Sequence, residues 1–328
     1  MEFVTDRIER AAFLPLPRPD TAEGRPRRVG VEIEFGGLTE METAALVQAV
    51  LGGRVVEDTP HEFVVDGTTL GDVEVCLDTA LRDKAGTALA DLGLELGRAV
   101  VPVEIVTAPL TPDDLPHLED LRKRLRAGGA QGSGGGLFLG FGVHLNPEIE
   151  GPEVGHILPV VRAYALLEDW LRKADPIDPS RRLLPFVDPY PRSFVDRLAG
   201  APDWSLGALI DAYLEETPTR NRGLDMLPVF RHLDEARVLA GLDDASAVSA
   251  RPAYHYRLPD SRLDDPEWTL AYEWNRWVMV ERLANRPDAL ERLARDWLEY
   301  REAWTTTRPD WLAHVEARLD ELNLWEAA

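Results

Sequence analysis

Apolar and polar residues alternate over residues 28–36, and this pattern predicts a β-strand. The apolar side chains at the odd positions point to one side of such a strand, and Glu32 and Glu34 point to the other. Two carboxylates about 4 Å apart repel each other by about 4 kcal/mol at an effective dielectric constant of 20. The segment therefore predicts either a strand with one solvated face or a buried strand whose acids hold a cation.

The same analysis predicts strands in the first part of the chain and helices in the rest. Further alternating segments predict strands at 54–57, 61–65, 72–77, 101–107, 137–145 and 253–258, with Asp66-Gly67 as a hairpin signal. Helices are predicted at 40–51, 79–98, 111–127, 153–174, 205–216 and 224–240, and in a long aromatic-rich segment from Pro266 that Pro287 interrupts. Because strands concentrate in the first 146 residues and helices in the remainder, the expected fold class is α+β with an antiparallel sheet and not alternating βαβ units.

The expected domain organisation is simple. Residues 1–27 are rich in proline and charge and are expected to form an extended lead-in. Residues 28–328 are expected to form one domain, sheet-rich over 28–146 and mainly helical over 147–328. The glycine-rich segment 128–136 lacks the Gly-Lys-Ser/Thr ending of a phosphate-binding loop, so a lid or a linker is the better interpretation.

Composition narrows the function classes. With 36 basic against 58 acidic residues, the net charge of -22 argues against nucleic-acid binding, although a few arginines and a divalent ion can still hold a nucleotide. The single cysteine, Cys76, excludes an internal disulfide and a cysteine zinc cluster. No apolar run is long enough for a membrane span, and the first seven residues lack a secretory pattern. We expect a cytoplasmic protein without membrane contact.

Two further strands carry polar residues in apolar surroundings. Glu104 lies in the segment 101–110, and His144 and Asn146 share one face of the strand that ends at Pro147. A histidine within an apolar strand is more often a satisfied core residue than a ligand. Three strands that each present acid or imidazole nevertheless predict a site for divalent cations, either Mg²⁺ with oxygen ligands or Mn²⁺, which tolerates histidine better.

Anion-binding groups are offered by two arginine-containing segments. Arg220 and Arg222 lie in one, and Arg257 and Arg262 lie in the other. The spacing alone leaves open whether they bind an anion or form a charged helix start and a surface loop.

The order of these motifs resembles that of the putative amidoligase family, which belongs to the glutamine synthetase and glutamate-cysteine ligase superfamily. The resemblance covers roughly residues 28–285, and it is carried by the order of the motifs. These are Gly30-Val-Glu-Ile-Glu-Phe, Asp66-Gly-Thr, Glu104-Ile-Val-Thr-Ala-Pro-Leu, Gly142-Val-His-Leu-Asn, and Arg220-Asn-Arg with Leu224-Asp-Met-Leu-Pro.

The resemblance implies an antiparallel sheet curved into a half-barrel, as in glutamine synthetase, backed by helices and holding MgATP against its concave face. A substrate carboxylate would take the γ-phosphate, and an amine or ammonia would then displace phosphate to form an amide. The implied partners are a small-molecule or peptide carboxylate and an amine or ammonia donor. A homo-oligomer or an amidotransferase partner stays open.

The resemblance also implies roles for single residues. Glu32, Glu34 and Glu104 match metal-binding glutamates, and His144 matches a histidine that meets the nucleotide phosphates or a metal, with Asn146 beside it. Asp66 matches an acid near the metals or the incoming amine. Arg257 matches the arginine that steadies the transferring phosphoryl group, with Arg222 expected at the nucleotide and Arg262 at the reaction centre.

Two features depart from the family pattern. His255 stands where the superfamily commonly has a metal-binding glutamate, so a second metal is expected to be weakly held, to be Mn²⁺, or to be missing. The chain also carries an insertion over 68–101, in which Glu74 is either a further ligand or a hairpin surface residue.

Three functional hypotheses follow. The first is an ATP-dependent carboxylate-amine ligase. The second is a nucleotide- or ligand-binding protein on the same fold with impaired catalysis, which the change at His255 motivates. The third is a phosphotransferase.

Overall fold

A single antiparallel sheet of eight strands organises the computed structural model, which describes residues 8–59, 61–78, 102–133, 140–182, 187–201, 203–303 and 307–324. The strands follow the order β2-β3-β4-β5-β1-β6-β8-β7, and every neighbouring pair is antiparallel. Their bounds are β1 (Val29–Phe35), β2 (Arg54–Thr59), β3 (Glu62–Thr68), β4 (Gly71–Leu77), β5 (Val103–Thr107), β6 (Val143–Pro147), β7 (Leu224–Asp225) and β8 (His255–Tyr256). The strands β2 and β7 form opposite ends, so in the described residues the sheet stays open. The α+β class is confirmed, whereas the half-barrel curvature and the likeness to glutamine synthetase stay predictions.

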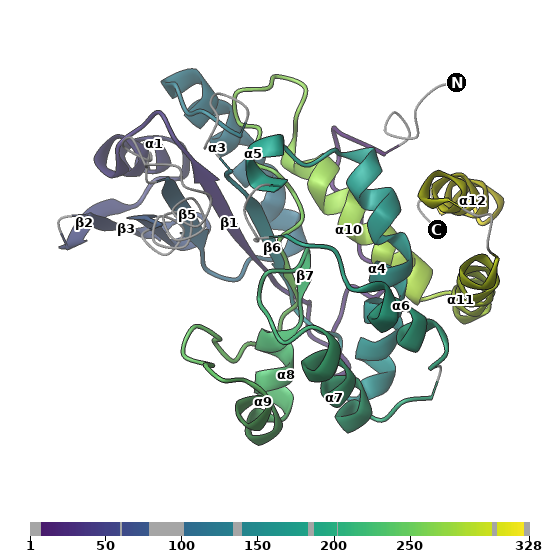
Figure 1. The fold of residues 1–328 in the computed structure, drawn as a ribbon. Helices are drawn as coiled ribbons and strands as arrows, with labels where there is room; N and C mark the ends of the chain where they lie inside the picture. The colour runs from purple at the N-terminus through teal and green to yellow at the C-terminus, as the bar shows by residue number, and fades with distance from the viewer. Residues whose placement is uncertain are drawn as a thin grey trace, which may run out of the picture.

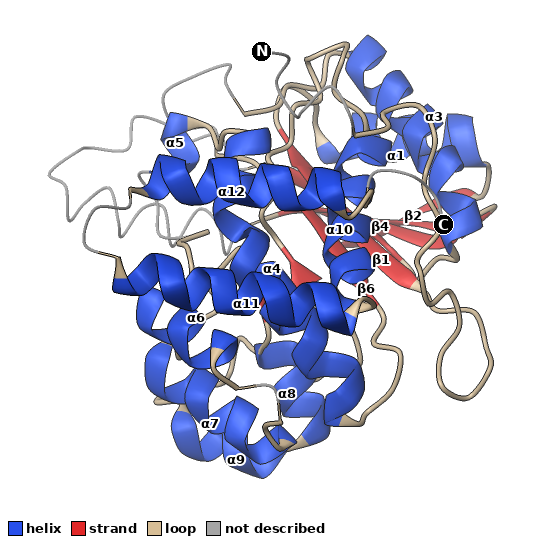
Figure 2. Cartoon of the chain, turned by 90° about the vertical axis from the view of Figure 1, so that its right-hand side faces the viewer, coloured by secondary structure: helices blue, strands red, loops and turns tan. Residues whose placement is uncertain are grey.

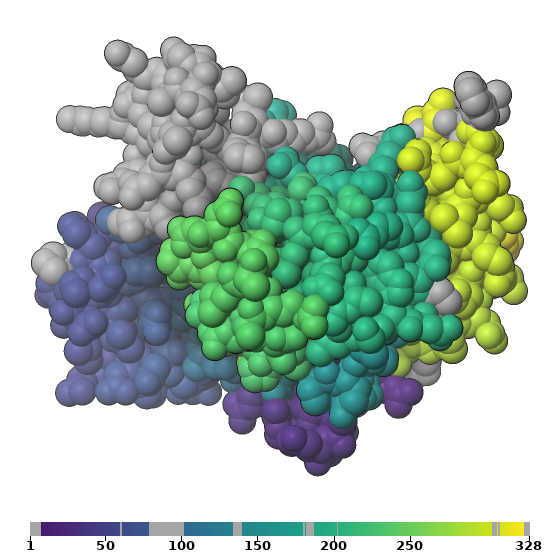
Figure 3. Space-filling model, turned by 60° about the horizontal axis from the view of Figure 1, so that its bottom comes forward, coloured from purple at the N-terminus to yellow at the C-terminus, as the bar shows by residue number. Residues whose placement is uncertain are grey.

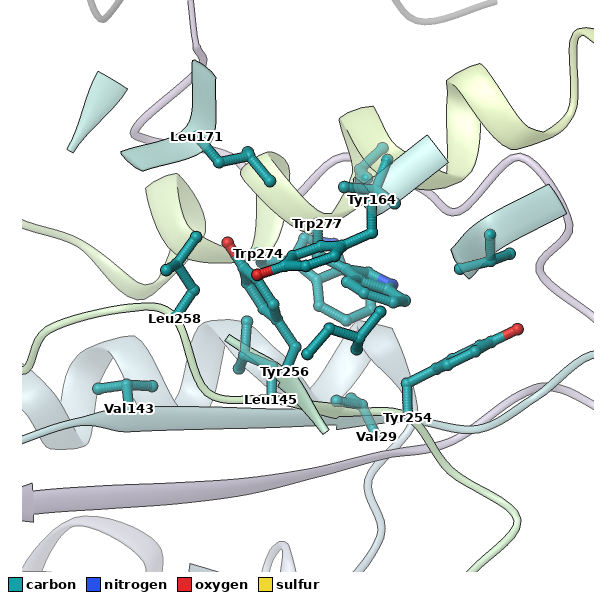
Figure 4. Close-up of a cluster of buried hydrophobic side chains, with 14 of the residues drawn as sticks. Val29, Val143, Leu145, Tyr164, Leu171, Tyr254, Tyr256, Leu258, Trp274 and Trp277 are labelled. Atoms are coloured by element: carbon teal, nitrogen blue, oxygen red, sulfur yellow. The ribbon is translucent and has the colours of Figure 1, made fainter. Parts of the chain in front are cut away.

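One face of the sheet is apolar and is covered by a layer of helices. The helices are α1 (Glu40–Leu51), α3 (Leu115–Gly128), α4 (Val154–Ala174) and α10 (Leu270–Ala284). Helix α1 packs on β3 and β4, and α3 contacts both α1 and α10, so the layer is continuous across the sheet. Figure 4 shows the part of this core below α10, where the Tyr256 ring lies 5.4 Å from that of Trp277. Trp277 of α10 thus packs against a strand of the sheet.

The remaining helices lie outside this layer or beyond the β7 edge. Helices α11 (Pro287–Glu302) and α12 (Arg308–Glu321) cover α4 on the side away from the sheet, and Figure 2 views them from the front. Figure 1 shows α7 (Leu206–Glu216), α8 (Leu227–Leu233) and α9 (Glu235–Gly241) grouped below β7. Helix α6 (Arg192–Ala199) packs between α4 and α7, and α5 (Pro179–Arg182) and a 3₁₀ turn (Pro112–Asp114) are short. None of the described helices is both long enough and apolar enough to span a membrane.

The described part of the N-terminal lead-in, residues 8–27, packs along α10. Asn275 accepts a hydrogen bond from the Leu14 backbone, and the Trp274 indole donates to the Leu14 carbonyl oxygen. Arg27 forms a buried bidentate ion pair with Glu281, with both N···O distances 2.7 Å. Both side chains are only 2% exposed, so the pair anchors the chain directly before β1 to the helical layer.

Most predicted elements are confirmed, and the exceptions have local causes. The capping box of Thr39 and Glu42 starts α1 as expected. The hairpin between β3 and β4 turns at Thr69 and Leu70, so the prediction of a turn at Asp66-Gly67 was wrong. The Thr68 hydroxyl builds this turn by accepting from the Leu70 N–H and donating to the Gly71 carbonyl oxygen. Gly67 instead relieves a register irregularity within β3.

The predicted helix over 224–240 was also wrong in part. Its first two residues form β7 at the sheet edge, and two short helices, α8 and α9, follow. Asp234 ends the first and caps the second by accepting from the Arg237 N–H. The predicted helix at 79–98 lies outside the described residues, and so does part of the predicted strand 137–145.

Candidate functional site

The face of the sheet opposite the helices is polar at its centre, and we call it the site face. The register determines which side chains share it, because Glu34 lies opposite Glu104 and Glu32 lies opposite His144 across neighbouring strands. Leu145 pairs with Tyr256 on the helix face, so the residues before and after each of them point to the site face. The resulting group consists of Glu32, Glu34, Glu104, His144, Asn146, Asp225, His255 and Arg257.

Glu34, Glu104 and His144 form the first cluster, which we call the carboxylate set. Their ligand atoms lie within 4.8 Å of one another. Glu34 accepts a hydrogen bond of 2.6 Å from the Gly142 N–H, and its other oxygen lies 3.5 Å from His144 Nε2. These two contacts fix the Glu34 carboxylate beside Glu104, so two acids share one largely buried position.

Ionisation of both acids in the carboxylate set is electrostatically unfavourable. Burial, followed by repulsion from Glu34 and Glu32, raises the pKa of Glu104 to about 9. Burial also raises the pKa of Glu34, although the positive charge of His144 opposes this. Such shifts mean that the pair resists full ionisation near neutral pH unless a positive charge joins it.

Glu32, His144 and His255 form the second cluster, the histidine set, whose ligand atoms also lie within 4.8 Å of one another. Glu32 Oε2 lies 2.7 Å from His144 Nδ1, and its Oε1 accepts a 2.9 Å hydrogen bond from the Asn146 amide. Burial alone would raise the pKa of Glu32, but the hydrogen bond and charge of His144 lower it far below its usual range. The His144 and His255 rings meet edge to face, 5.2 Å apart.

Asp225 is a site residue that the sequence analysis did not identify. It is fully buried, and its Oδ2 lies 3.1 Å from His255 Nδ1 while its Oδ1 accepts from the Leu227 N–H. Burial lowers the pKa of His255 to about 4, although the hydrogen bond with Asp225 opposes this, so the ring is neutral near pH 7. A carboxylate behind a histidine that fixes its tautomer is the usual support of a metal ligand. The only signal was the Leu224-Asp-Met-Leu-Pro motif, which was predicted to be helical.

Arg257 brings positive charge to the same face. Its side chain is 9% exposed and donates to the Arg220 carbonyl oxygen at 2.8 Å. Its Nε is buried and has no hydrogen-bond partner among the described residues. Its charge acts on both acids of the carboxylate set, lowering the pKa of Glu104 and being stabilised by Glu34. This guanidinium therefore has a donor left for an anionic group beside the acids.

Arg181, another residue that the sequence analysis missed, supports the segment around Arg257. It donates to the backbone carbonyl oxygens of Arg257, Leu258 and Pro259 at 2.7 to 3.0 Å and pairs with Asp260 at 2.9 Å. A side chain at Gly142 would come within 2.6 Å of this guanidinium. The space left by Gly142 is thus occupied by Arg181.

The structure does not bring the predicted residues Asp66, Arg222 and Arg262 to these clusters. Asp66 is 52% exposed on β3 and pairs with Arg54 at 3.4 Å. Arg222 donates to Thr217 and to the Pro189 carbonyl oxygen. Arg262 pairs with Asp175 at 2.8 Å and donates to the Pro176 carbonyl oxygen. Each of these side chains has local partners instead.

A cleft of about 650 Å³ adjoins the histidine set. Glu32 and Asn146 line it on the side of the clusters, and Asp72 and Glu74 of β4 line it on the other. In Figure 3 it lies where the blue N-terminal strands border the green segment near residue 250, which contributes Arg251. Glu74, a predicted metal ligand, is thus on the site face but belongs to the cleft and not to either cluster.

The residues of the two clusters fit a divalent cation. The two largely buried acids keep raised pKa values although His144 and Arg257 lie beside them, and a divalent ion would supply the remaining positive charge. The carboxylate set offers oxygen ligands, as Mg²⁺ prefers, whereas the two imidazoles of the histidine set suit Mn²⁺ better.

Comparison with known proteins gives one result at the level of families. The model of a family described as "putative amidoligase enzyme" matches residues 25–279, which include every residue of both clusters and of the cleft. Searches of curated proteins and of solved structures found no match.

Proposed function

The chain belongs to the putative amidoligase family, and on this basis we propose that it is an ATP-dependent ligase that joins a carboxylate to an amine or to ammonia. In the proposed reaction a substrate carboxylate oxygen attacks the γ-phosphorus of ATP, and ADP leaves. The amine nitrogen then attacks the carbonyl carbon of the acyl phosphate, the C–O bond to phosphate breaks, and the nitrogen loses one proton. The products are an amide, ADP and inorganic phosphate.

One observation carries this proposal beyond the family match. Glu34 and Glu104 lie opposite each other in register, largely buried, with His144 and Arg257 beside them, and the neighbouring Glu32 lines a cleft. Acids that need a cation, next to a cationic side chain with a free donor, suit a phosphate chain that arrives with divalent metal. The cleft leaves room for the other substrates.

The residues would divide the work by charge. Glu34 and Glu104 would hold one divalent cation and Glu32 and His255 a second, and His144, whose neutral ring has one lone pair, would join one of the two. Bound metal would neutralise charge on the phosphate oxygens. Arg257 would face the phosphoryl group through its free Nε, while Asn146 would keep Glu32 oriented.

No covalent nucleophile is required by this reaction, and Cys76 does not offer one. Cys76 lies opposite Glu104 on the site face. Burial, followed by repulsion from Glu104, raises the pKa of the Cys76 thiol to about 12, so the reactive thiolate is scarce at neutral pH.

The test is a Glu34→Gln variant assayed for ADP release and for hydroxamate, with hydroxylamine as the amine and a panel of amino acids and peptides as carboxylates. Hydroxylamine intercepts an acyl phosphate without knowledge of the natural amine. We expect the variant to lose at least about 100-fold in turnover, because one ligand of the carboxylate set becomes neutral. Glu57→Gln, an exposed change on β2, is the matched control. Unchanged turnover in Glu34→Gln would remove the assignment.

A second candidate is a nucleotide-binding protein with impaired catalysis, and the histidine at 255 is the observation that favours it. A neutral imidazole brings no charge to a position that commonly carries an acid in the superfamily. Calorimetry with MgATP and MnATP separates the two cases, since tight binding without ADP release or hydroxamate would favour the binding protein. A stable phosphorylated product without amide would indicate a phosphotransferase instead.

A further inference from the structure

The cleft beside the histidine set has charges of opposite sign at its two ends. Asp72 and Glu74 project from β4 on one side, and Arg28 and Arg251 lie on the other, where the acids Glu32 and Glu148 are already paired with His144 and Arg25. Between the two sides the floor of the cleft is formed by residues with little or no side chain, Gly30 and Ala108. A cleft with this distribution suits a ligand that is itself charged at both ends.

The two acids at the acidic end have carboxylate oxygens available for a ligand. Glu74 is exposed in the cleft, and among the described residues no basic side chain forms an ion pair with it. Asp72 uses one oxygen to accept from the Gly67 N–H, which leaves its second oxygen available. The two carboxylates therefore offer acceptors to a protonated amine.

The two arginines at the basic end also have N–H donors available for a ligand. Arg251 is 54% exposed, and the side-chain contact that it makes among the described residues is a long 3.5 Å approach to Glu32. Glu32 is already held by His144 and Asn146, so it does not depend on Arg251. Arg28 directs one N–H to the Pro109 carbonyl oxygen and keeps the rest of its guanidinium free for a carboxylate.

The strand register gives the distance between Glu74 and Glu32, the acid that Arg251 approaches. Glu74 pairs with Val106 and Val106 pairs with Glu32, so Glu74 and Glu32 lie in one row, two strand intervals apart. At about 4.8 Å per interval the row spans about 10 Å. An extended chain covers about 3.3 to 3.6 Å per residue. The side chains on the two sides reach into the cleft and shorten the distance that a ligand must span. A ligand of two or three residues with a charge at each end therefore matches this distance. The α-ammonium and α-carboxylate of one amino acid are too close together for it.

We propose that this cleft binds a substrate whose carboxylate and ammonium group are separated by about the length of a di- or tripeptide. Arg251 holds the carboxylate beside the histidine set, with Arg28 as a second cation on that side of the cleft, and Glu74 and Asp72 hold the ammonium group. The inference rests on the proposed ligase function for the role of the bound molecule, and it names the class of carboxylate that the enzyme activates.

The test uses linear ω-amino acids as probes, from 3-aminopropanoate to 8-aminooctanoate, with binding to the full chain measured by calorimetry without nucleotide. We expect affinity to increase with length and to be greatest for 6- to 8-carbon probes. Hexylamine and hexanoate, which each carry one of the two charges, should bind about tenfold more weakly than 6-aminohexanoate. Equal binding of all chain lengths, or no binding of any, overturns the proposal.

Variants at the two ends make the test specific. Glu74→Gln should weaken 6-aminohexanoate and hexylamine about tenfold and leave hexanoate unchanged, whereas Arg251→Gln should weaken 6-aminohexanoate and hexanoate and leave hexylamine unchanged. Both residues are exposed, so the fold should persist, which circular dichroism would verify. Glu57→Gln and Arg124→Gln, exposed changes outside the cleft, are the matched controls. Variants that bind all probes like the wild-type chain overturn the proposal.

The outcomes of this test can be distinguished from those of the test of the ligase proposal. Charge-selective binding without hydroxamate formation would refute the ligase and leave the substrate cleft standing. Hydroxamate formation together with indifference to Glu74→Gln and Arg251→Gln would refute the cleft and leave the ligase standing.

Discussion

The carboxylate set and the histidine set share His144 and one face of the sheet, yet their electrostatics are opposite. In the first, burial raises the pKa values of Glu34 and Glu104, and repulsion from Glu34 raises that of Glu104 further. In the second, burial is outweighed by His144, and the pKa of Glu32 falls. Glu32 and Glu34 are two positions apart on one strand, so the difference comes from the neighbouring strands.

This contrast shows that the identity of a residue does not determine how it responds to a cation. Glu34 lies opposite another acid and gains most from added positive charge. Glu32 lies opposite an imidazole, and its charge is already compensated by His144 and, at longer range, by Arg251. The carboxylate set should therefore need a cation for its stability, and the histidine set should select which cation it takes.

The largest effect is expected from removing the support of the histidine set. Asp225→Asn should lower the affinity of this set for Mn²⁺ by about 10- to 100-fold, because Asp225 holds the His255 ring in place. Mn²⁺ titration followed by electron paramagnetic resonance would measure it, with Mg²⁺ as competitor. Asp211→Asn, at an exposed acid that pairs with Arg237, is the control. Two Mn²⁺ sites with unchanged affinities would show that Asp225 has no such role.

The next effect concerns stability and pH. A carboxyl whose folded pKa is raised binds its proton more tightly in the native state, so its ionisation costs stability as pH rises. The metal-free protein should therefore lose stability between about pH 4.5 and pH 9, the range over which Glu104 is affected. Glu104→Gln should flatten this loss and stabilise the metal-free protein at pH 8 by about 2 kcal/mol.

Chemical denaturation at several pH values, with and without Mn²⁺, would measure this effect. Added Mn²⁺ should stabilise the wild-type chain more than the Glu104→Gln variant. A metal-free stability that rises between pH 5 and pH 8 by the same amount in both proteins would contradict the pKa assigned to Glu104.

The smallest effect has the opposite sign and completes the comparison. The pKa of Glu32 is lowered in the fold, so its ionised form stabilises the native state above the unfolded pKa, and this contribution is lost as pH falls. Glu32→Gln should therefore destabilise the metal-free protein by about 1 kcal/mol at pH 7, and the difference should shrink below about pH 4. Denaturation of the two proteins side by side measures it, and a stabilising substitution would refute the contrast between the sets.

Much of the fold could be predicted from local signals. The capping box at Thr39 and Glu42 and the break at Pro287 are properties of short segments, and both are confirmed. The β7 strand could not be predicted, because two residues form it only by pairing with β8. Asp225 was missed for the same reason, since its partner His255 is thirty residues away in the chain.

For the site, the sequence determined that Glu32 and Glu34 face away from the apolar side of their strand, because side chains alternate with a period of two whatever the strand pairs with. It also gave Glu104 and His144 as polar residues within apolar strands. Only the tertiary structure decided that Glu34 lies opposite Glu104 and Glu32 opposite His144, and that Asp66 lies apart from both. Register and strand order depend on pairing between distant segments, and a single segment holds no record of its partner.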